Sequence, residues 1–188
     1  MQTSTTPTSR WNTGWKLRTK GYDETTTSTR LTPTTDPNGN DGLVRRIDHL
    51  VIHHSASVLT TTTADLVKWH TSPKNLGGRG WKRVGYHLIV EGGGELVLGT
   101  PIGLVGSHVR GSNSNSVGIC LVGDNTTLSR RWVGSQIATL KRVLSVLGVL
   151  FPGAVVLGHR DMPNTATECP GIDVRNLLGL SPLNDTGI

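Results

Sequence analysis

The chain has 188 residues and a formal net charge of +6. Its two cysteines exclude a disulfide-stapled secreted fold, and its longest apolar run, VLSVLGVLF, falls well short of the about 20 residues that span a membrane. The N-terminal stretch has no apolar segment, so we expect no secretory signal and synthesis in a cytoplasm. The basic balance predicts attraction to polyanions, for which nucleic acid, anionic lipid and anionic cell-wall polymers are the candidates.

The first part of the chain differs in composition from the rest. Residues 1–42 are rich in Thr, Ser and Pro, which is the composition of turns and linkers. We therefore predict an N-terminal arm over 1–42, followed by one folded domain over 43–188. Trp11, Trp15 and Tyr22 give this arm side chains with which it could dock on another surface.

Strand and helix patterns alternate after Leu43, with polar or glycine-rich stretches between them. Strands are predicted at 45–54 (RRIDHLVIHH), in a hairpin at 84–90 and 95–100 (VGYHLIV and ELVLGT), at 116–123 (SVGICLVG) and at 154–158 (AVVLG). Helices are predicted within 62–73 (TTADLVKWHTSP), over 135–151 (SQIATLKRVLSVLGVLF) and through 172–178 (IDVRNLL). This order predicts the α/β class, with a sheet that has helices packed on its faces.

The stretch 135–151 carries the strongest helical periodicity of the chain. Ser135 is its expected N-cap, because a serine hydroxyl can accept a hydrogen bond from a free N–H of the first turn. An apolar stripe at helical spacing predicts the face that packs on the sheet. Its members are Ile137, Leu140, Leu144, Leu147 and Phe151.

Histidines stand at or near the ends of several predicted strands. His53 and His54 end the first strand, His87 sits beside Tyr86 in another, and His159 directly follows the strand 154–158. Strand ends are where an open α/β sheet gathers functional groups. Because side chains alternate along a strand, His53 and His54 point to opposite faces, so only one of them can serve a given site. His87 alternates away from Tyr86 and is expected to be structural.

Cys169 follows His159 by ten residues in the loop sequence GHRDMPNTATECPG. A thiolate and two imidazoles suit Zn²⁺, and a catalytic zinc keeps three protein ligands and one open position. A histidine of the first strand, His159 and Cys169 would complete such a set. The rival interpretation is a nucleophilic Cys169 with a histidine as its base. The spacing alone does not choose between them.

Four motifs in order carry a resemblance to a known family. HLVIHHSAS, WKRVGYHLIV, GSHVRGSNSNSVGICLVGD and GHRD…TECPG resemble the zinc-dependent type 2 N-acetylmuramoyl-L-alanine amidases. That family includes phage lysozyme-type endolysins and the peptidoglycan recognition proteins. The resemblance covers about 47–178 and implies a single mixed central β-sheet flanked by helices.

The resemblance also implies roles for individual residues. It makes His53, His159 and Cys169 the ligands of one catalytic zinc, and Tyr86 the catalytic tyrosine. Thr167 falls where the family has a polar partner of the reaction centre. The phage enzymes typically have a lysine there, whereas catalytically active recognition proteins have a threonine.

The implied activity is hydrolysis of the amide between N-acetylmuramic acid and L-alanine in peptidoglycan by a zinc-activated water. The family further implies a phage endolysin that acts on the bacterial cell wall after release from the cytoplasm. Two other functions stay open, a peptidoglycan-binding module without catalysis and a regulatory protein that binds through its basic arm. Such non-catalytic members commonly lack the cysteine ligand, so Cys169 favours catalysis.

Further residues receive weaker assignments from the same resemblance. His108, Asn113 and Arg160 are expected either to line a groove for the glycan and peptide or to stabilise their loops. Asp161 is expected to orient a ligand or to anchor its own loop. Cys120 lies where some bacterial relatives carry a glutamate, and its apolar strand predicts a core position.

Peptidoglycan is the expected partner, and anionic envelope polymers are the expected partners of the basic surface. No specific nucleic-acid binding and no membrane insertion are expected, and we expect a monomer.

Overall fold

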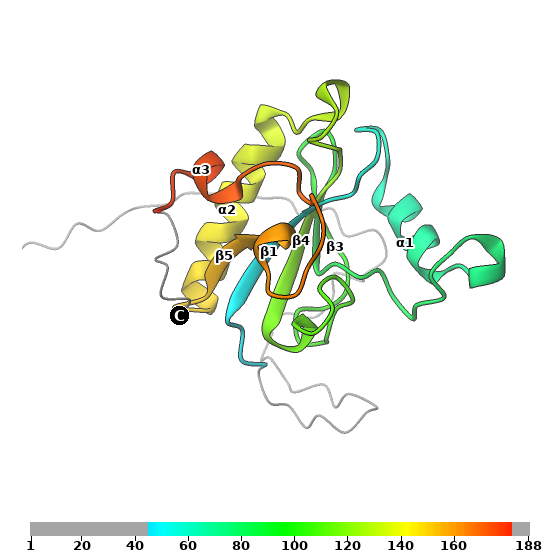
Figure 1. The fold of residues 1–188 in the computed structure, drawn as a ribbon, viewed down its shortest axis with the longest axis horizontal. Coiled ribbons are helices and arrows are strands. Elements are labelled where there is room, and N and C mark those ends of the chain that lie inside the picture. Colours follow the sequence, from blue (N-terminus) through cyan, green and yellow to red (C-terminus); the bar gives the residue numbers. More distant parts are fainter. Residues whose placement is uncertain (1–44, 182–188) are drawn as a thin grey trace, which may run out of the picture.

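The computed structural model describes residues 45–181, so the predicted arm over 1–42 lies outside the described residues. Figure 1 shows how the elements are arranged. The strands are β1 (His49–His54), β2 (Leu88–Val90), β3 (Leu96–Leu98), β4 (Ser116–Leu121) and β5 (Val155–Gly158). The helices are α1 (Thr63–Thr71), α2 (Gly134–Leu150) and α3 (Val174–Leu178). The 3₁₀ turns are η1 (Lys74–Leu76), η2 (Asn113–Asn115), η3 (Leu128–Arg130) and η4 (His159–Asp161).

The five strands form one sheet in the order β3-β2-β4-β1-β5. β1 pairs in parallel with β4 and β5, β2 pairs in parallel with β4, and only β3 is antiparallel to its neighbour. The predicted single mixed sheet with flanking helices is therefore confirmed. β1 has parallel neighbours on both edges, which explains why its sequence is apolar on both faces.

The two faces of the sheet are covered by different helices. Leu50 and Ile52 of β1 belong to the core cluster that also contains Leu140 of α2. On the opposite face, Leu66 of α1 packs in one cluster with Cys120 of β4. Alternation along β1 turns His53 away from the α2 side, whereas the sequence predicts only that His53 and His54 point to opposite faces.

Both longer helices begin close to where the sequence predicts, but the cap of α2 differs from the predicted one. Thr62 caps α1 with its side chain. The predicted Ser135 cap of α2 is wrong, because the N-cap is Val133. Gln136 accepts a hydrogen bond from the Val133 N–H and donates one to the Val122 carbonyl on the sheet. These bonds anchor the start of the helix at Gly134, one residue before Ser135.

The predicted apolar stripe of α2 does face the sheet. Leu140 and Leu147 are buried, and Ile137, Leu144 and Phe151 pack partly buried against the same core. Among residues 45–181, no helix combines the length and the apolar character needed to cross a bilayer.

Candidate metal centre and active site

Three potential metal ligands meet at the ends of two neighbouring parallel strands. His53 is the penultimate residue of β1, His159 opens η4 directly after β5, and Cys169 lies in the loop before α3. One ligand atom from each lies within 4.8 Å of the others. Parallel pairing of β1 with β5 brings two of the three together, because the carboxyl ends of both strands lie at one edge.

The orientation of the His53 ring suits a metal ligand. Its Nδ1 lies 3.8 Å from the Cys169 Sγ, and its ring centroid lies 4.6 Å from that of His159. Two imidazole nitrogens and one sulfur are the donor set of a catalytic Zn²⁺, which leaves the fourth position for water or substrate. The residues present therefore fit zinc.

Burial sets the protonation states of these groups. Desolvation lowers the pKa of His53 well below its usual range and also lowers that of His159, so both imidazoles are neutral and carry a free lone pair. Desolvation raises the pKa of the Cys169 thiol to about 11. A divalent cation beside the sulfur opposes that effect, since it stabilises the thiolate.

Hydrogen bonds from neighbouring segments hold the loop that carries Cys169. The Arg160 N–H donates to the Cys169 carbonyl at 2.7 Å. The Asn125 side chain is buried and donates to the Pro170 carbonyl at 2.9 Å. Asp161 accepts from the Gly158 N–H at 2.9 Å, so this carboxylate anchors its own loop. Asn125 was not singled out by the sequence, because nothing local marks its contact with a residue 45 positions away.

Tyr86 stands beside the candidate metal centre, with its ring 5.2 Å from that of His53. The expectation that Tyr86 and His87 lie within a strand is wrong, because β2 begins at Leu88. Burial raises the pKa of Tyr86 well above its ordinary value, and the nearby Cys120 and Cys169 thiols raise it further. The hydroxyl is therefore a proton-bearing donor at neutral pH.

His70, which no motif of the sequence marks, contacts the Tyr86 ring. The His70 ring lies between Trp81 and Tyr86, with centroid distances of 4.7 and 5.5 Å. Its Nδ1 accepts a hydrogen bond from the Gly85 N–H, next to the tyrosine in the chain. His87 has a structural role, as expected, since its Nδ1 accepts from the Gly118 N–H of β4.

Thr167 is half-buried and lies close to the Cys169 backbone. Its hydroxyl oxygen accepts a hydrogen bond from the Cys169 N–H at 3.2 Å. A hydroxyl that accepts in this way still has its own hydrogen to donate. The two cysteines are not joined by a disulfide, and Cys120 is fully buried in the sheet, as its apolar strand predicts.

The three residues assigned to a substrate groove lie in different settings. His108 is buried, and its Nδ1 lies 3.1 Å from the His53 Nε2. Asn113 uses its side-chain oxygen to accept from the N–H groups of His108 and Val109, which is a loop-stabilising contact. Arg160 is half-buried, with its Nε 3.6 Å from the Asp161 carboxylate.

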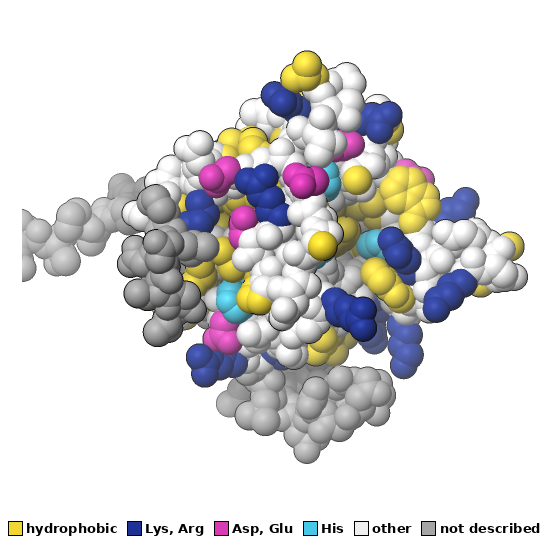
Figure 2. Space-filling model, viewed as in Figure 1, with side chains coloured by type: hydrophobic (Ala, Val, Ile, Leu, Met, Phe, Trp, Pro, Cys, Tyr) yellow, Lys and Arg dark blue, Asp and Glu magenta, His cyan; other side chains and the backbone are white. Residues whose placement is uncertain are grey.

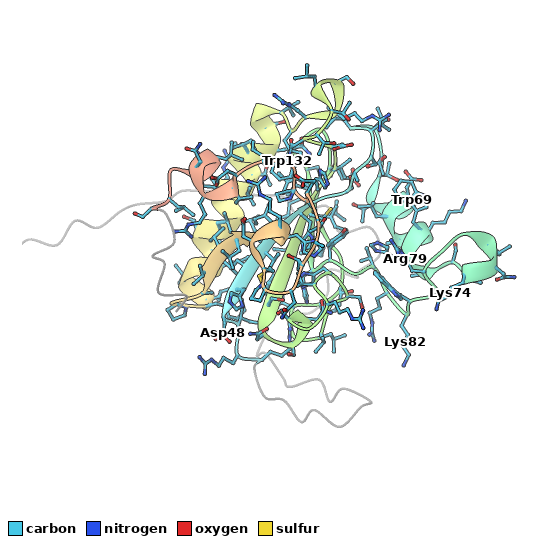
Figure 3. The ribbon with its side chains drawn as sticks, in the orientation of Figure 1. Asp48, Trp69, Lys74, Arg79, Lys82 and Trp132 are labelled. Carbon is cyan, nitrogen blue, oxygen red and sulfur yellow. The ribbon has the colours of Figure 1, made fainter. Side chains whose placement is uncertain are left out.

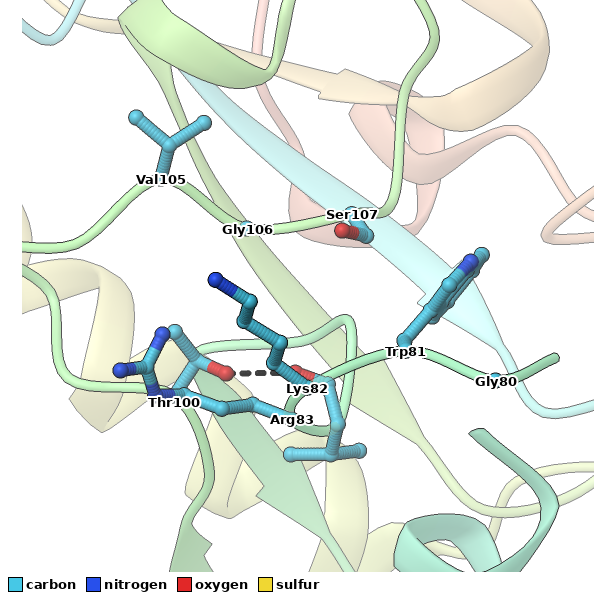
Figure 4. Close-up of a pocket in the computed structure, with 9 residues that line it drawn as sticks. Gly80, Trp81, Lys82, Arg83, Thr100, Val105, Gly106 and Ser107 are labelled. Carbon is cyan, nitrogen blue, oxygen red and sulfur yellow. Dashed lines mark hydrogen bonds between the residues drawn. The ribbon is translucent and has the colours of Figure 1, made fainter. Parts of the chain in front are cut away.

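A pocket of about 330 Å³ lies along residues 80–84, the segment that precedes Tyr86 in the chain, and is shown in Figure 4. Trp81, Lys82 and Arg83 line one side of it, and Val105 and Ser107 line the other. The two cations make it suited to anionic groups.

The stretch 66–90, which supplies one side of this pocket, contains lysines and arginines but no acidic residue. No acidic residue stands between Asp65 and Glu91. Figure 2 shows Lys and Arg side chains gathered on the side of the molecule where α1 and η1 lie, and Figure 3 labels Lys74, Arg79 and Lys82 there with Trp69. The cations of the stretch are Lys68, Lys74, Arg79, Lys82 and Arg83.

Comparisons with known proteins agree with this geometry. A family model described as N-acetylmuramoyl-L-alanine amidase matches residues 43–172. The chain is 34% identical over 131 residues to an endolysin of Klebsiella phage KP32, a match that covers 67% of this chain and 82% of that protein. The structure resembles the endolysin of the Thermus scotoductus phage Ph2119, with a TM-score of 0.63 and 26% identity over 71% of this chain and 83% of the other. It also resembles Drosophila PGRP-LB, with a TM-score of 0.59 and 27% identity over 75% of this chain and 86% of the other.

Proposed function

Because the chain belongs to the N-acetylmuramoyl-L-alanine amidase family, we propose that it hydrolyses the amide between N-acetylmuramic acid and L-alanine in peptidoglycan, as a phage endolysin. The observation that carries this proposal is the convergence of His53, His159 and Cys169 beside Tyr86. Its similarity to phage endolysins supports the cell wall as the place of action.

The three ligands would hold one zinc ion. When bound, zinc lowers the pKa of a coordinated water to about 7 and polarises a substrate carbonyl. The chain supplies two neutral imidazoles and the Cys169 sulfur, which would bind the cation as a thiolate, and hydrogen bonds hold the Cys169 loop in place. The presence of Cys169 favours catalysis over a binding-only role.

Two hydroxyl groups would act on the reacting amide. Tyr86 keeps its proton at neutral pH and can donate a hydrogen bond to the oxygen that gains negative charge during attack. The Thr167 hydroxyl accepts a hydrogen bond from the Cys169 N–H and keeps its own hydrogen, so it would serve as a second donor.

Replacing Thr167 with alanine tests the second donor. We expect turnover to fall about 100-fold with zinc content retained, because one preorganised donor to an oxyanion is worth about 3 kcal/mol. Thr167→Ser keeps the hydroxyl and is the matched control, so its turnover should stay within a few-fold of the unmodified chain. Equal turnover of the alanine and serine variants would remove Thr167 from the mechanism.

The substrate side of the proposal draws on the basic stretch 66–90. Lys82 and Arg83 in the pocket along residues 80–84 would bind carboxylates of a peptidoglycan stem peptide. The remaining cations would add attraction to anionic envelope polymers. We further propose that the catalytic unit begins near residue 43, where the family match begins, and that 1–42 is an accessory arm.

The reaction itself is tested with purified peptidoglycan and the full chain. We expect new L-alanine amino termini to appear in step with solubilisation, without new reducing sugar ends, and we expect prior zinc chelation to reduce their release more than about 100-fold. New reducing ends without new amino termini would identify a glycosidase. Binding to the wall without either product would identify a recognition module.

A further inference from the structure

The buried histidine His108 lies behind the candidate ligand His53, on the side away from the metal position. His53 turns its Nδ1 toward the Cys169 sulfur and its Nε2 toward His108, at 3.1 Å from the His108 Nδ1. The two rings stand edge to face, 5.1 Å apart and 88° inclined. His108 therefore occupies the place from which the second nitrogen of a metal-bound histidine is normally hydrogen-bonded.

The direction of the hydrogen bond between His53 and His108 follows from the contacts that His108 makes through Ser116 with the Ser112 carbonyl. The Ser116 hydroxyl lies within hydrogen-bond distance of the Ser112 carbonyl, which can only accept. Ser116 therefore has only lone pairs left for the His108 Nε2, 3.4 Å away, and that nitrogen must carry the hydrogen. A neutral His108 protonated on Nε2 has its lone pair on Nδ1, so the His53 Nε2 must donate.

The same series of bonds fixes the tautomer of His53. With its hydrogen on Nε2, the neutral ring presents the Nδ1 lone pair to the space shared with Cys169 and His159. The opposite tautomer would place a hydrogen where a metal must bind.

The surroundings hold His108 in this position. Asn113 accepts from the His108 N–H at 2.8 Å and from the next N–H at 2.9 Å. Gly118 of β4 lies directly under the ring, and a Cβ there would stand 2.5 Å from the His108 Cγ. Gly106 leaves similar space on another side, with 2.9 Å from its would-be Cβ to the His108 Cδ2. Only glycine backbone allows so close an approach.

We propose that His108 is a positioning residue that presets the His53 ring and its tautomer for metal binding, through the bonds to Ser116 and Ser112. This inference rests on the proposed zinc site. It assigns the GSHVRG motif to support of a ligand in place of contact with the substrate.

The test is zinc affinity of the full chain, measured by competition with a chromophoric chelator. His108→Phe keeps a ring but has no acceptor, so we expect zinc to bind about 10–100-fold more weakly. His108→Asn can present its side-chain oxygen where Nδ1 lies and should restore the affinity to within a few-fold. The absorption bands of the cobalt-substituted protein should shift in His108→Phe and return in His108→Asn.

His87→Phe is the matched control for loss of a buried histidine. His87 bonds to Gly118 and Leu104, and its ring touches that of His108 at a centroid distance of 5.5 Å without bonding to the His108 Nδ1. Its replacement should lower the melting temperature and leave zinc affinity within a few-fold of the unmodified chain. Unaltered affinity in His108→Phe, or equal loss in His87→Phe or His108→Asn, would overturn the positioning role alone. An unmodified chain that binds no zinc would overturn the proposed metal site as well.

Discussion

Cys169→Ser is expected to lose zinc and activity together. The serine hydroxyl stays protonated and neutral where the thiolate supplied a negative charge and a strong bond to zinc. Since even groups that only support a metal ligand are worth about 10–100-fold in affinity, the loss should exceed about 100-fold. Zinc content after dialysis and release of amino termini from peptidoglycan measure the two effects on one sample.

Cys120→Ala is the matched control for this experiment. Cys120 is the other cysteine, fully buried in β4 and outside the group of three ligand atoms. It should lose some stability through the small cavity, by about 1 kcal/mol, and keep one zinc per chain. Zinc-depleted Cys169→Ser protein that turned over at the unmodified rate would rule out the metal mechanism.

Tyr86→Phe is expected to lower kcat by about 10²–10³ while zinc content stays the same, because it removes one hydroxyl donor and keeps the ring. The ring contacts to His53 and His70 should survive, so the melting temperature should change little. Steady-state turnover of soluble muropeptide separates the effect on kcat from that on KM.

Tyr22→Phe is the matched control, since Tyr22 is the only other tyrosine of the chain and precedes the family match. It should leave kcat unchanged. An undiminished kcat in Tyr86→Phe would rule out Tyr86 as the hydrogen-bond donor and leave Thr167 as the donor of the proposed mechanism.

The sheet could be predicted from sequence because its strands are apolar on both faces and its hairpin is short. The three ligand candidates could be found because His53 stands near the end of a strand, His159 follows another strand, and Cys169 lies ten residues further on in the same loop. Strand alternation separated His53 from His54 without choosing between them, and the choice came from the family resemblance.

What could not be predicted are contacts made by irregular segments. The loop that carries His108 has no periodicity, and its bond to His53 joins residues 55 positions apart. The same holds for Asn125 and Pro170, and for His70 beside Tyr86. The Ser135 cap failed for a related reason, since Gln136 donates to the distant carbonyls of Val90 and Val122, which a local motif cannot reveal.

Because side chains alternate along β1, its register determines both which residues enter the core and which residue reaches the ligand group. Ile52 belongs to the core beneath α2, while its neighbour His53 belongs to the candidate metal centre on the opposite face. A slip of one residue would exchange them, burying an imidazole against α2 and placing an isoleucine among the ligands. Core packing and ligand orientation therefore depend on the same strand register. A chain that packs β1 correctly against α2 also points His53 toward the candidate metal centre, whereas a chain with the wrong register loses core stability.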